Sequence, residues 1–185
     1  ETNLVVSSGA GKTGVGIDVS RSYLSSNNLG NHARTALTGF LEHRFELFDE
    51  TLDITPGIAL SYYSDFKSKV FPGLDIGYRI SDVFKLYANM GFTYRVPTFT
   101  DMYYVGPTTM GNADLKPESA FSKEIGMKLG AGKFRFNIAF FQRNSTDLID
   151  WTKDLEEAKW EARNFSKVRT TGFETDVDFN FKVAN

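Results

Sequence analysis

Apolar and polar side chains alternate with a period of two over long stretches of this 185-residue chain. Successive side chains of a β-strand point to opposite faces, so this pattern predicts strands with one apolar and one polar face. The clearest example is residues 85–95, and the pattern returns at residues 121–129. On the first of these stretches the apolar face carries Leu86, Ala88, Met90, Phe92 and Tyr94, and the other face carries Lys85, Tyr87, Asn89, Gly91, Thr93 and Arg95.

The same alternation predicts about nine strands along the chain. Several of them are long for strands of a soluble protein. We therefore expect an all-β fold, an antiparallel up-and-down meander. The expected strands are Asn3–Ser8, Gly14–Ser25, Arg34–Phe48, Thr51–Ser64, Val70–Ile80, Val83–Tyr94, Ser119–Leu129, Phe134–Arg143 and Val168–Val183.

Short and long connections alternate between these strands. Short connections are expected at residues 9–13, 49–50, 81–82 and 130–133, and longer ones at residues 26–33, 65–69, 96–118 and 144–167. In a meander this places all short turns at one end and all long loops at the other, as in transmembrane β-barrels of the outer membrane. Immunoglobulin-like sandwiches and jelly rolls have shorter strands and Greek-key connections. A soluble sheet with one solvated face remains open.

The polar faces carry charges of both signs. Glu174, Asp176 and Asp178 share one face of the last strand, which therefore needs water or basic partners. A water-filled barrel interior would supply both. Basic residues on the polar faces of other strands are Arg44, Arg79, Lys85, Arg135 and Arg143.

Several function classes lack support in the composition. The net charge of −2 gives no bias toward nucleic acid, and the absence of cysteine excludes disulfides and thiolate metal sites. No run of about eighteen apolar residues exists, which argues against a transmembrane helix. His32 and His43 lie far apart in the pattern, and no Ser-His-Asp arrangement or paired carboxylates mark a pocket. We therefore expect no enzyme, no catalytic residue, no metal site and no cofactor.

Residues 7–14, SSGAGKTG, look superficially like a phosphate-binding loop. That motif requires glycine at the place of Val6 and a helix after the loop, whereas an alternating strand follows here. The segment is therefore predicted to be a hairpin turn.

Aromatic side chains gather in the two longest loops, namely Tyr103, Tyr104, Trp151 and Trp160. The loop at residues 144–167 is expected to form either a short helix or a β-excursion. The four aromatic residues are candidates for ligand contact, and packing of the loops on each other is the equal alternative.

Five segments resemble the barrel region of TonB-dependent outer-membrane receptors. RVPTFTDMYY at residues 95–104 is followed by GNADLKPES and EIGMKL, and FFQRNSTDLIDW and NFSKVRTTGFETDVDF fit the next strands. The upstream segment SSNNLGNHAR is similar to the cobalamin-receptor branch of the family. The resemblance implies a loop-shaping motif formed by Arg95, Pro97, Gly111, Asn112, Leu115, Lys116, Pro117 and Glu118.

The resemblance also implies that the chain is one piece of a larger barrel. Such receptors close about twenty-two strands around a plug, so residues 1–185 are expected to be a partial barrel domain without the plug and the terminal strands. The implied function is a segment of an outer-membrane active transporter for a scarce nutrient such as a siderophore, cobalamin or glycan. A passive porin or an adhesin-type outer-membrane β-protein is the alternative.

The implied location is the outer membrane of a Gram-negative bacterium. The implied partners are the nutrient, outer-membrane lipid and, through the missing plug region, the TonB complex. The two unpaired edge strands of an isolated piece also predict self-association through those edges.

Overall fold

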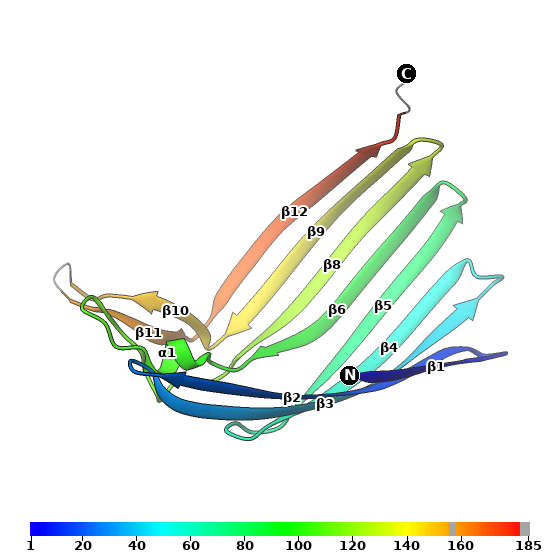
Figure 1. The fold of residues 1–185 in the computed structure, drawn as a ribbon. Coiled ribbons are helices and arrows are strands. Elements are labelled where there is room, and N and C mark those ends of the chain that lie inside the picture. The colour runs from blue at the N-terminus through cyan, green and yellow to red at the C-terminus, as the bar shows by residue number, and fades with distance from the viewer. Residues whose placement is uncertain (156–157, 182–185) are drawn as a thin grey trace, which may run out of the picture.

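A computed structural model, which describes residues 1–155 and 158–181, is dominated by one antiparallel sheet of nine strands (Figure 1). The strand order follows the chain, so the sheet is an up-and-down meander, as predicted. Its strands are β1 (Thr2–Ser8), β2 (Gly11–Ser26), β3 (Gly30–Leu47), β4 (Leu52–Tyr63), β5 (Lys69–Ser81), β6 (Phe84–Arg95), β8 (Glu118–Ala131), β9 (Phe134–Thr146) and β12 (Val168–Phe179).

Tight turns join the strands at one end of the sheet. The supposed phosphate-binding segment is the β1–β2 hairpin, which turns at Gly9 and Ala10, as the sequence predicts. Residues 48–51 connect β3 to β4 through three consecutive left-handed residues, Phe48, Asp49 and Glu50, with φ of 53°, 55° and 60°. This conformation is unusual for residues other than glycine and reverses the chain within a few residues.

The opposite end carries the longer connections, with one exception. Strands β2 and β3 stay paired as far as Ser26 and Gly30, so only residues 27–29 turn the chain there. The loop expected at residues 26–33 is therefore a tight turn, because Gly30 adopts a left-handed φ of 83° that lets the ladder close.

The two longest connections contain secondary structure of their own. Residues 96–117 include helix α1 (Phe99–Tyr103) and strand β7 (Thr109–Met110), whereas the sequence indicated only a loop. The described part of residues 147–167 forms strands β10 (Leu148–Thr152) and β11 (Trp160–Phe165), so the β-excursion is correct and the described part contains no helix. Strands β10, β11 and β7 make a second, three-stranded sheet.

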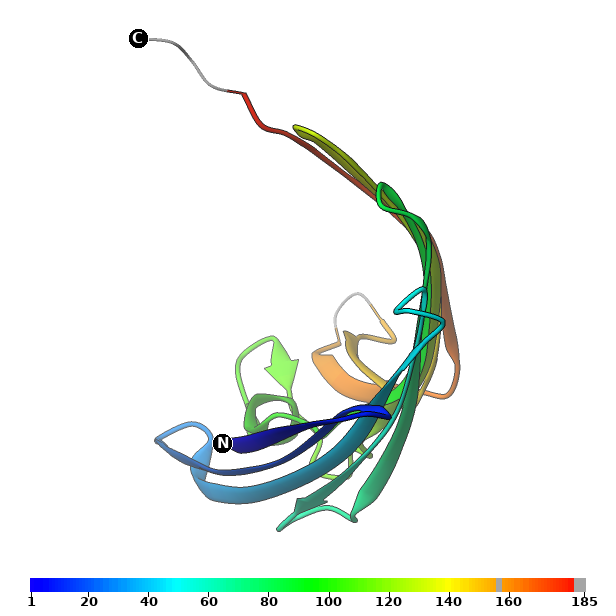
Figure 2. The same cartoon turned by 90° about the vertical axis from the view of Figure 1, so that its right-hand side faces the viewer.

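The large sheet is curved, and α1, β7, β10 and β11 lie on its concave side (Figure 2). Arg95 of β6 contacts Asp101 of α1 at 3.4 Å, so the polar face of β6 faces the concave side. The register then assigns the polar faces of the other strands to the same side. There Asp178 lies opposite Arg135, and Asn137 donates to Asp176 at 3.2 Å, which gives two of the carboxylates of β12 polar neighbours.

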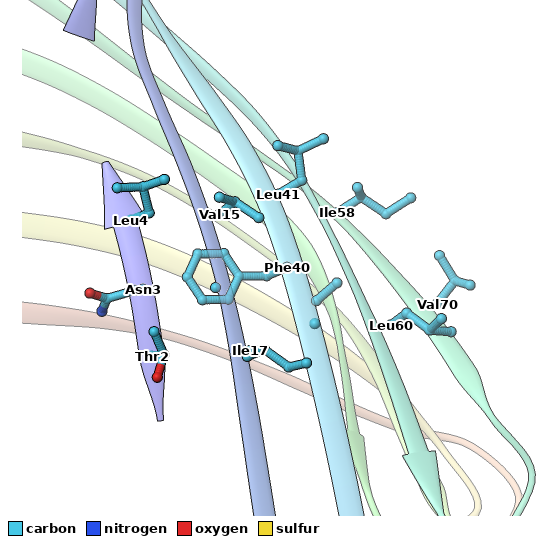
Figure 3. A pocket seen from close by; sticks show the side chains of 13 residues that line it. Thr2, Asn3, Leu4, Val15, Ile17, Phe40, Leu41, Ile58, Leu60 and Val70 are labelled. Atoms are coloured by element: carbon cyan, nitrogen blue, oxygen red, sulfur yellow. The ribbon is translucent and has the colours of Figure 1, made fainter. Parts of the chain in front are cut away.

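The convex face is mostly apolar and open. Leu4, Val15, Leu41 and Ile58 form one row across β1–β4, and Ile17, Leu60 and Val70 belong to the next row (Figure 3). A shallow groove runs between these side chains at Gly39, which contributes no side chain to fill it. An exposed apolar face of this extent is typical of a surface that contacts a membrane or another protein.

Most large apolar side chains of the sheet are exposed, and the buried core is small. The cluster of Leu115, Ile149 and Ala162 lies in the two long connections, outside the nine-stranded sheet. No helix among the described residues is long and apolar enough to cross a membrane.

Candidate functional site

The two long connections, residues 96–117 and the described part of residues 147–167, pack together into one body that we call the loop layer. Strands β10 and β11 pair antiparallel from Leu148 and Phe165 onward, and β7 pairs parallel with β11 through Trp160 and Thr109. Leu115, Ile149 and Ala162 form its buried core, and Trp151 packs against this core. The two loops therefore share one hydrophobic centre.

Helix α1 begins where the sequence supplies a capping box. The Thr98 hydroxyl accepts a hydrogen bond from the Asp101 amide at 3.0 Å, and the Asp101 carboxylate accepts one from the Thr98 amide at 3.0 Å. This reciprocal pair satisfies two amides that a helix start leaves without partners. Pro97, directly before the cap, is fully buried, and Met102 is the buried residue of the helix.

Arg95 and Glu118 join the loop layer to the large sheet. They are opposite residues at the ends of β6 and β8. Arg95 Nε and Nη2 lie 3.0 and 3.1 Å from the two carboxylate oxygens of Glu118, a bidentate ion pair. Glu118 also accepts from the Ile149 amide at 3.1 Å, and Arg95 reaches Asp101 at 3.4 Å. This pair therefore contacts α1, β10 and both strands of the wall.

The remaining residues of the expected loop-shaping motif lie around that pair. A Cβ on Gly111 would come within 2.8 Å of the Met102 carbonyl carbon, so only glycine fits there without a shift of the backbone. Asn112 accepts from the Asp114 amide at 2.9 Å, which forms a local turn. The Lys116 backbone exchanges two hydrogen bonds of 2.9 Å with the Asn164 side chain of β11.

Pro117 is half-buried, next to the buried Glu118. Together with the contacts above, this means that every motif residue inferred from the resemblance lies in the loop layer or at its junction with the sheet.

The candidate aromatic residues occupy different environments. Tyr103 stacks on His32 of β3 with ring centroids 3.8 Å apart and planes 3° from parallel. Trp151 is half-buried on the core of the loop layer. Tyr104 is half-buried, whereas Trp160 is 43% exposed with the Lys153 ammonium 5.5 Å from its ring centroid. Trp160 thus presents the most accessible aromatic surface of the four.

Arg34 was not singled out in the sequence, yet it binds three neighbouring segments. Its guanidinium forms an ion pair with Asp65 at 2.8 Å, donates to the Pro97 carbonyl at 2.9 Å, and lies 4.9 Å from the Phe99 ring centroid. The sequence could have pointed to Arg34 as a residue that contacts the loops, since it lies on the polar face at the loop end of its strand. Its partners, however, are 31 to 68 residues away in the chain.

A second ion-pair group braces the β10–β11 hairpin. Arg163 contacts Asp154 through two hydrogen bonds of 2.7 Å and Glu161 at 2.7 Å. The Arg163 hydrogen bonds hold the pKa of Asp154 below its ordinary value. This pair therefore persists at mildly acidic pH and is lost only as the pH falls through that lowered pKa.

Among residues 1–155 and 158–181, no group of three or more His, Asp or Glu side chains could hold a metal ion. His43, the other histidine, shares a hydrogen bond of 2.7 Å with Thr13 far from the loop layer.

A family model described as "TonB dependent receptor-like, beta-barrel" matches residues 6–185. The chain belongs to this family. The named relatives of this TonB-dependent receptor barrel are receptors and transporters. A vitamin B12 transporter of Vibrio vulnificus (strain YJ016) is 28% identical over 110 residues, which are 60% of this chain and 18% of the transporter. The ferrienterobactin receptor of Escherichia coli (strain K12) is 26% identical over 126 residues, covering 60% of this chain and 17% of the receptor.

Solved structures of the family share the fold of this barrel segment. The siderophore receptor PirA from Pseudomonas aeruginosa superposes with a TM-score of 0.82 at 19% identity, over 95% of this chain and 35% of the receptor. The hemophore receptor HasR of Serratia marcescens, solved with its hemophore and heme, gives a TM-score of 0.78 at 14% identity, over 97% of this chain and 38% of that chain. The chain thus spans between 17% and 38% of the length of these proteins.

Proposed function

We propose that the chain forms part of the wall and the mouth of an outer-membrane active transporter in a Gram-negative bacterium, which captures a scarce nutrient such as a siderophore, cobalamin or glycan. The observation that carries this proposal is the loop layer. It lies on the concave, polar side of a sheet whose convex side is apolar (Figure 2). A layer so placed covers the mouth of a water-filled barrel, where a ligand enters.

Within this proposal the residues divide into two roles. Trp160 and Tyr104 contact the nutrient, because Trp160 is the most exposed of the candidate aromatics and Tyr104 stacks on no other ring among the residues that the structure describes. Tyr103 and Trp151 have a structural role, since one stacks on His32 and the other packs on the core of the layer. The chain acts through binding and has no catalytic role.

The proposed partners follow from this placement. Outer-membrane lipid covers the convex face, whose rows of leucine, valine and isoleucine suit hydrocarbon. The TonB complex acts on the complete receptor through its plug region, outside this chain.

The test is uptake by the complete receptor that carries this chain. It is produced in a host deleted for its own cobalamin and siderophore receptors, and uptake of radiolabelled cobalamin and of ferric siderophores is measured with and without TonB. Uptake of at least one nutrient only in the presence of TonB supports the proposal. Uptake at equal rates in both hosts would instead identify a passive porin, and surface binding without uptake an adhesin.

A further inference from the structure

The convex face carries a small group of cations that the role of barrel wall does not explain. By register, the charged side chains on the convex side of the nine described strands are Arg21, Lys123 and Arg169. All three are basic, and the carboxylates of these strands lie on the concave side. A charge on a lipid-facing surface is costly unless it reaches a polar partner.

Two of these cations lie together with polar neighbours. Phe121, Asn144 and Arg169 form one row across β8, β9 and β12, and Lys123, Gln142 and Thr171 form the next row. The next row toward the short turns is Ile125, Phe140 and Phe173, which is wholly apolar. We call Lys123, Gln142, Asn144, Arg169 and Thr171 the outer basic patch.

The patch therefore sits at the boundary of the apolar band, on the side of the loop layer. Arg169 Nε donates to Asn144 Oδ1 at 3.2 Å, which aligns its guanidinium along this face. Lys123 and Arg169 are separated by one strand, about 10 Å across the sheet and about 7 Å along it. Their long side chains can converge on one anion over that distance. Lys123, Arg169 and Thr171 are all exposed.

We propose that the outer basic patch binds the phosphate of a membrane lipid headgroup in the leaflet on the loop side. The charge argument selects this occupant. An anion is required because the patch has two cations and its face has no carboxylate in the described strands. At the edge of an apolar band, the anions available are lipid phosphates, which lysine binds as a point charge and arginine as a fork.

The surroundings of the patch suit the rest of such a lipid. Phe92 and Phe121 pack at 4.9 Å between ring centroids beside it, and Met90 lies opposite Lys123 on β6. Phe92 and Phe121 lie on the loop side of Lys123, and the row of Ile125, Phe140 and Phe173, where acyl chains would lie, is on its other side. The amides of Gln142 and Asn144 add hydrogen-bond donors for polar groups of the headgroup.

The proposal rests on the membrane location in the proposed function, and its test reads lipid binding directly. The complete receptor is purified in detergent and titrated with lipid A, a phosphorylated glycolipid, or with the same lipid stripped of its phosphates. Bound lipid is counted by native mass spectrometry. The variants are the double substitution Lys123→Gln with Arg169→Gln, and Arg21→Gln, which removes one cation from the same face far from the patch.

Each basic residue near an anionic lipid surface contributes about fivefold in affinity, so the double variant should bind phosphorylated lipid roughly 25-fold more weakly. Arg21→Gln should bind it as the wild type does, and dephosphorylated lipid should bind wild type and double variant equally weakly. Equal affinity of wild type and double variant for the phosphorylated lipid would overturn the proposal. So would a wild type that binds both lipids alike, a result that needs no variant to fold.

Nutrient uptake of the same variants separates the two proposals. Uptake that depends on TonB, combined with unchanged lipid affinity in the double variant, refutes the lipid site alone. A 25-fold difference that is kept in a receptor whose uptake does not depend on TonB refutes the transport function alone.

Discussion

The Glu118→Ala substitution should release the loop layer from the barrel wall. Glu118 is 6% exposed, accepts hydrogen bonds from Arg95 Nη2 and the Ile149 amide, and lies 3.0 Å from Arg95 Nε in an ion pair. Alanine leaves the Ile149 amide without its acceptor in a buried site and removes the anion that Arg95 pairs with. The substitution therefore acts on the junction of both long connections at once.

The magnitude follows from the burial of each partner. An orphaned buried amide costs about 2 kcal/mol. Arg95 is 43% exposed at its side chain and keeps Asp101 at 3.4 Å, so loss of its ion pair adds only about 1 kcal/mol. The sum of about 3 kcal/mol lowers the free energy of local opening and raises the population of the open layer roughly 100-fold.

Hydrogen exchange of the complete receptor measures this opening. Amides of residues 148–152 and 160–165 should exchange roughly 100-fold faster in Glu118→Ala, while those of β6 and β8 below the junction keep their protection. Glu118→Gln, which retains one acceptor oxygen, should give an intermediate rate.

The matched control is Glu124→Ala. Glu124 is a carboxylate of the same strand and the same concave face whose side chain accepts one long hydrogen bond, 3.4 Å from Asn89. It should leave exchange in the loop layer unchanged. Unchanged exchange in Glu118→Ala itself, or equal acceleration by both substitutions, would refute the idea that the Arg95–Glu118 pair holds the layer.

Three further outcomes are expected. Gly126→Ala should destabilise the barrel by about 1–3 kcal/mol through overpacking and so lower its thermal midpoint, because a Cβ there would meet the Tyr87 ring at 2.5 Å. Gly130→Ala adds a Cβ with nothing within 4 Å and should leave the midpoint unchanged. Equal midpoints of the two variants in heated gel-mobility assays would contradict this. Trp160→Ala should weaken nutrient binding in equilibrium titrations without changing exchange in the loop layer, and Trp151→Ala should do the reverse; binding unaffected by Trp160→Ala would remove that residue from the mouth. The isolated chain should self-associate in detergent through the unpaired edges of β1 and β12, and a monomer by light scattering at all concentrations would argue against edge pairing.

The nine-stranded sheet was predictable because its determinants are local. Alternation with a period of two marks each strand, and a tight turn such as residues 132–133 forces neighbours in sequence to pair. The strand predicted to end at Arg143 continues to Thr146 in β9. Its last three residues show no alternating pattern and are in the strand because they pair with β8.

The loop layer was only partly predictable because long-range contacts determine it. Strand β7 is two residues long and exists through parallel pairing with β11, about fifty residues later in the chain. Nothing local distinguishes Trp151, which packs on a buried core, from Trp160, which does not. The pairing of Arg95 with Glu118 is different, because the predicted strands end at Tyr94 and begin at Ser119, and the ladder extends by only one residue to bring Arg95 opposite Glu118.

The account as a whole depends on which medium covers each face of the sheet. The chain contains no cysteine, so single cysteines can be placed along β6 in the complete receptor, after any cysteines elsewhere have been replaced. In native membranes, labelling by a lipid-soluble probe should be strong at residues 86, 88, 90 and 92 and weak at residues 85, 87, 89 and 91. A water-soluble reagent should give the opposite alternation. Equal labelling of both sets by the water-soluble reagent would contradict a membrane-spanning wall and favour a soluble sheet.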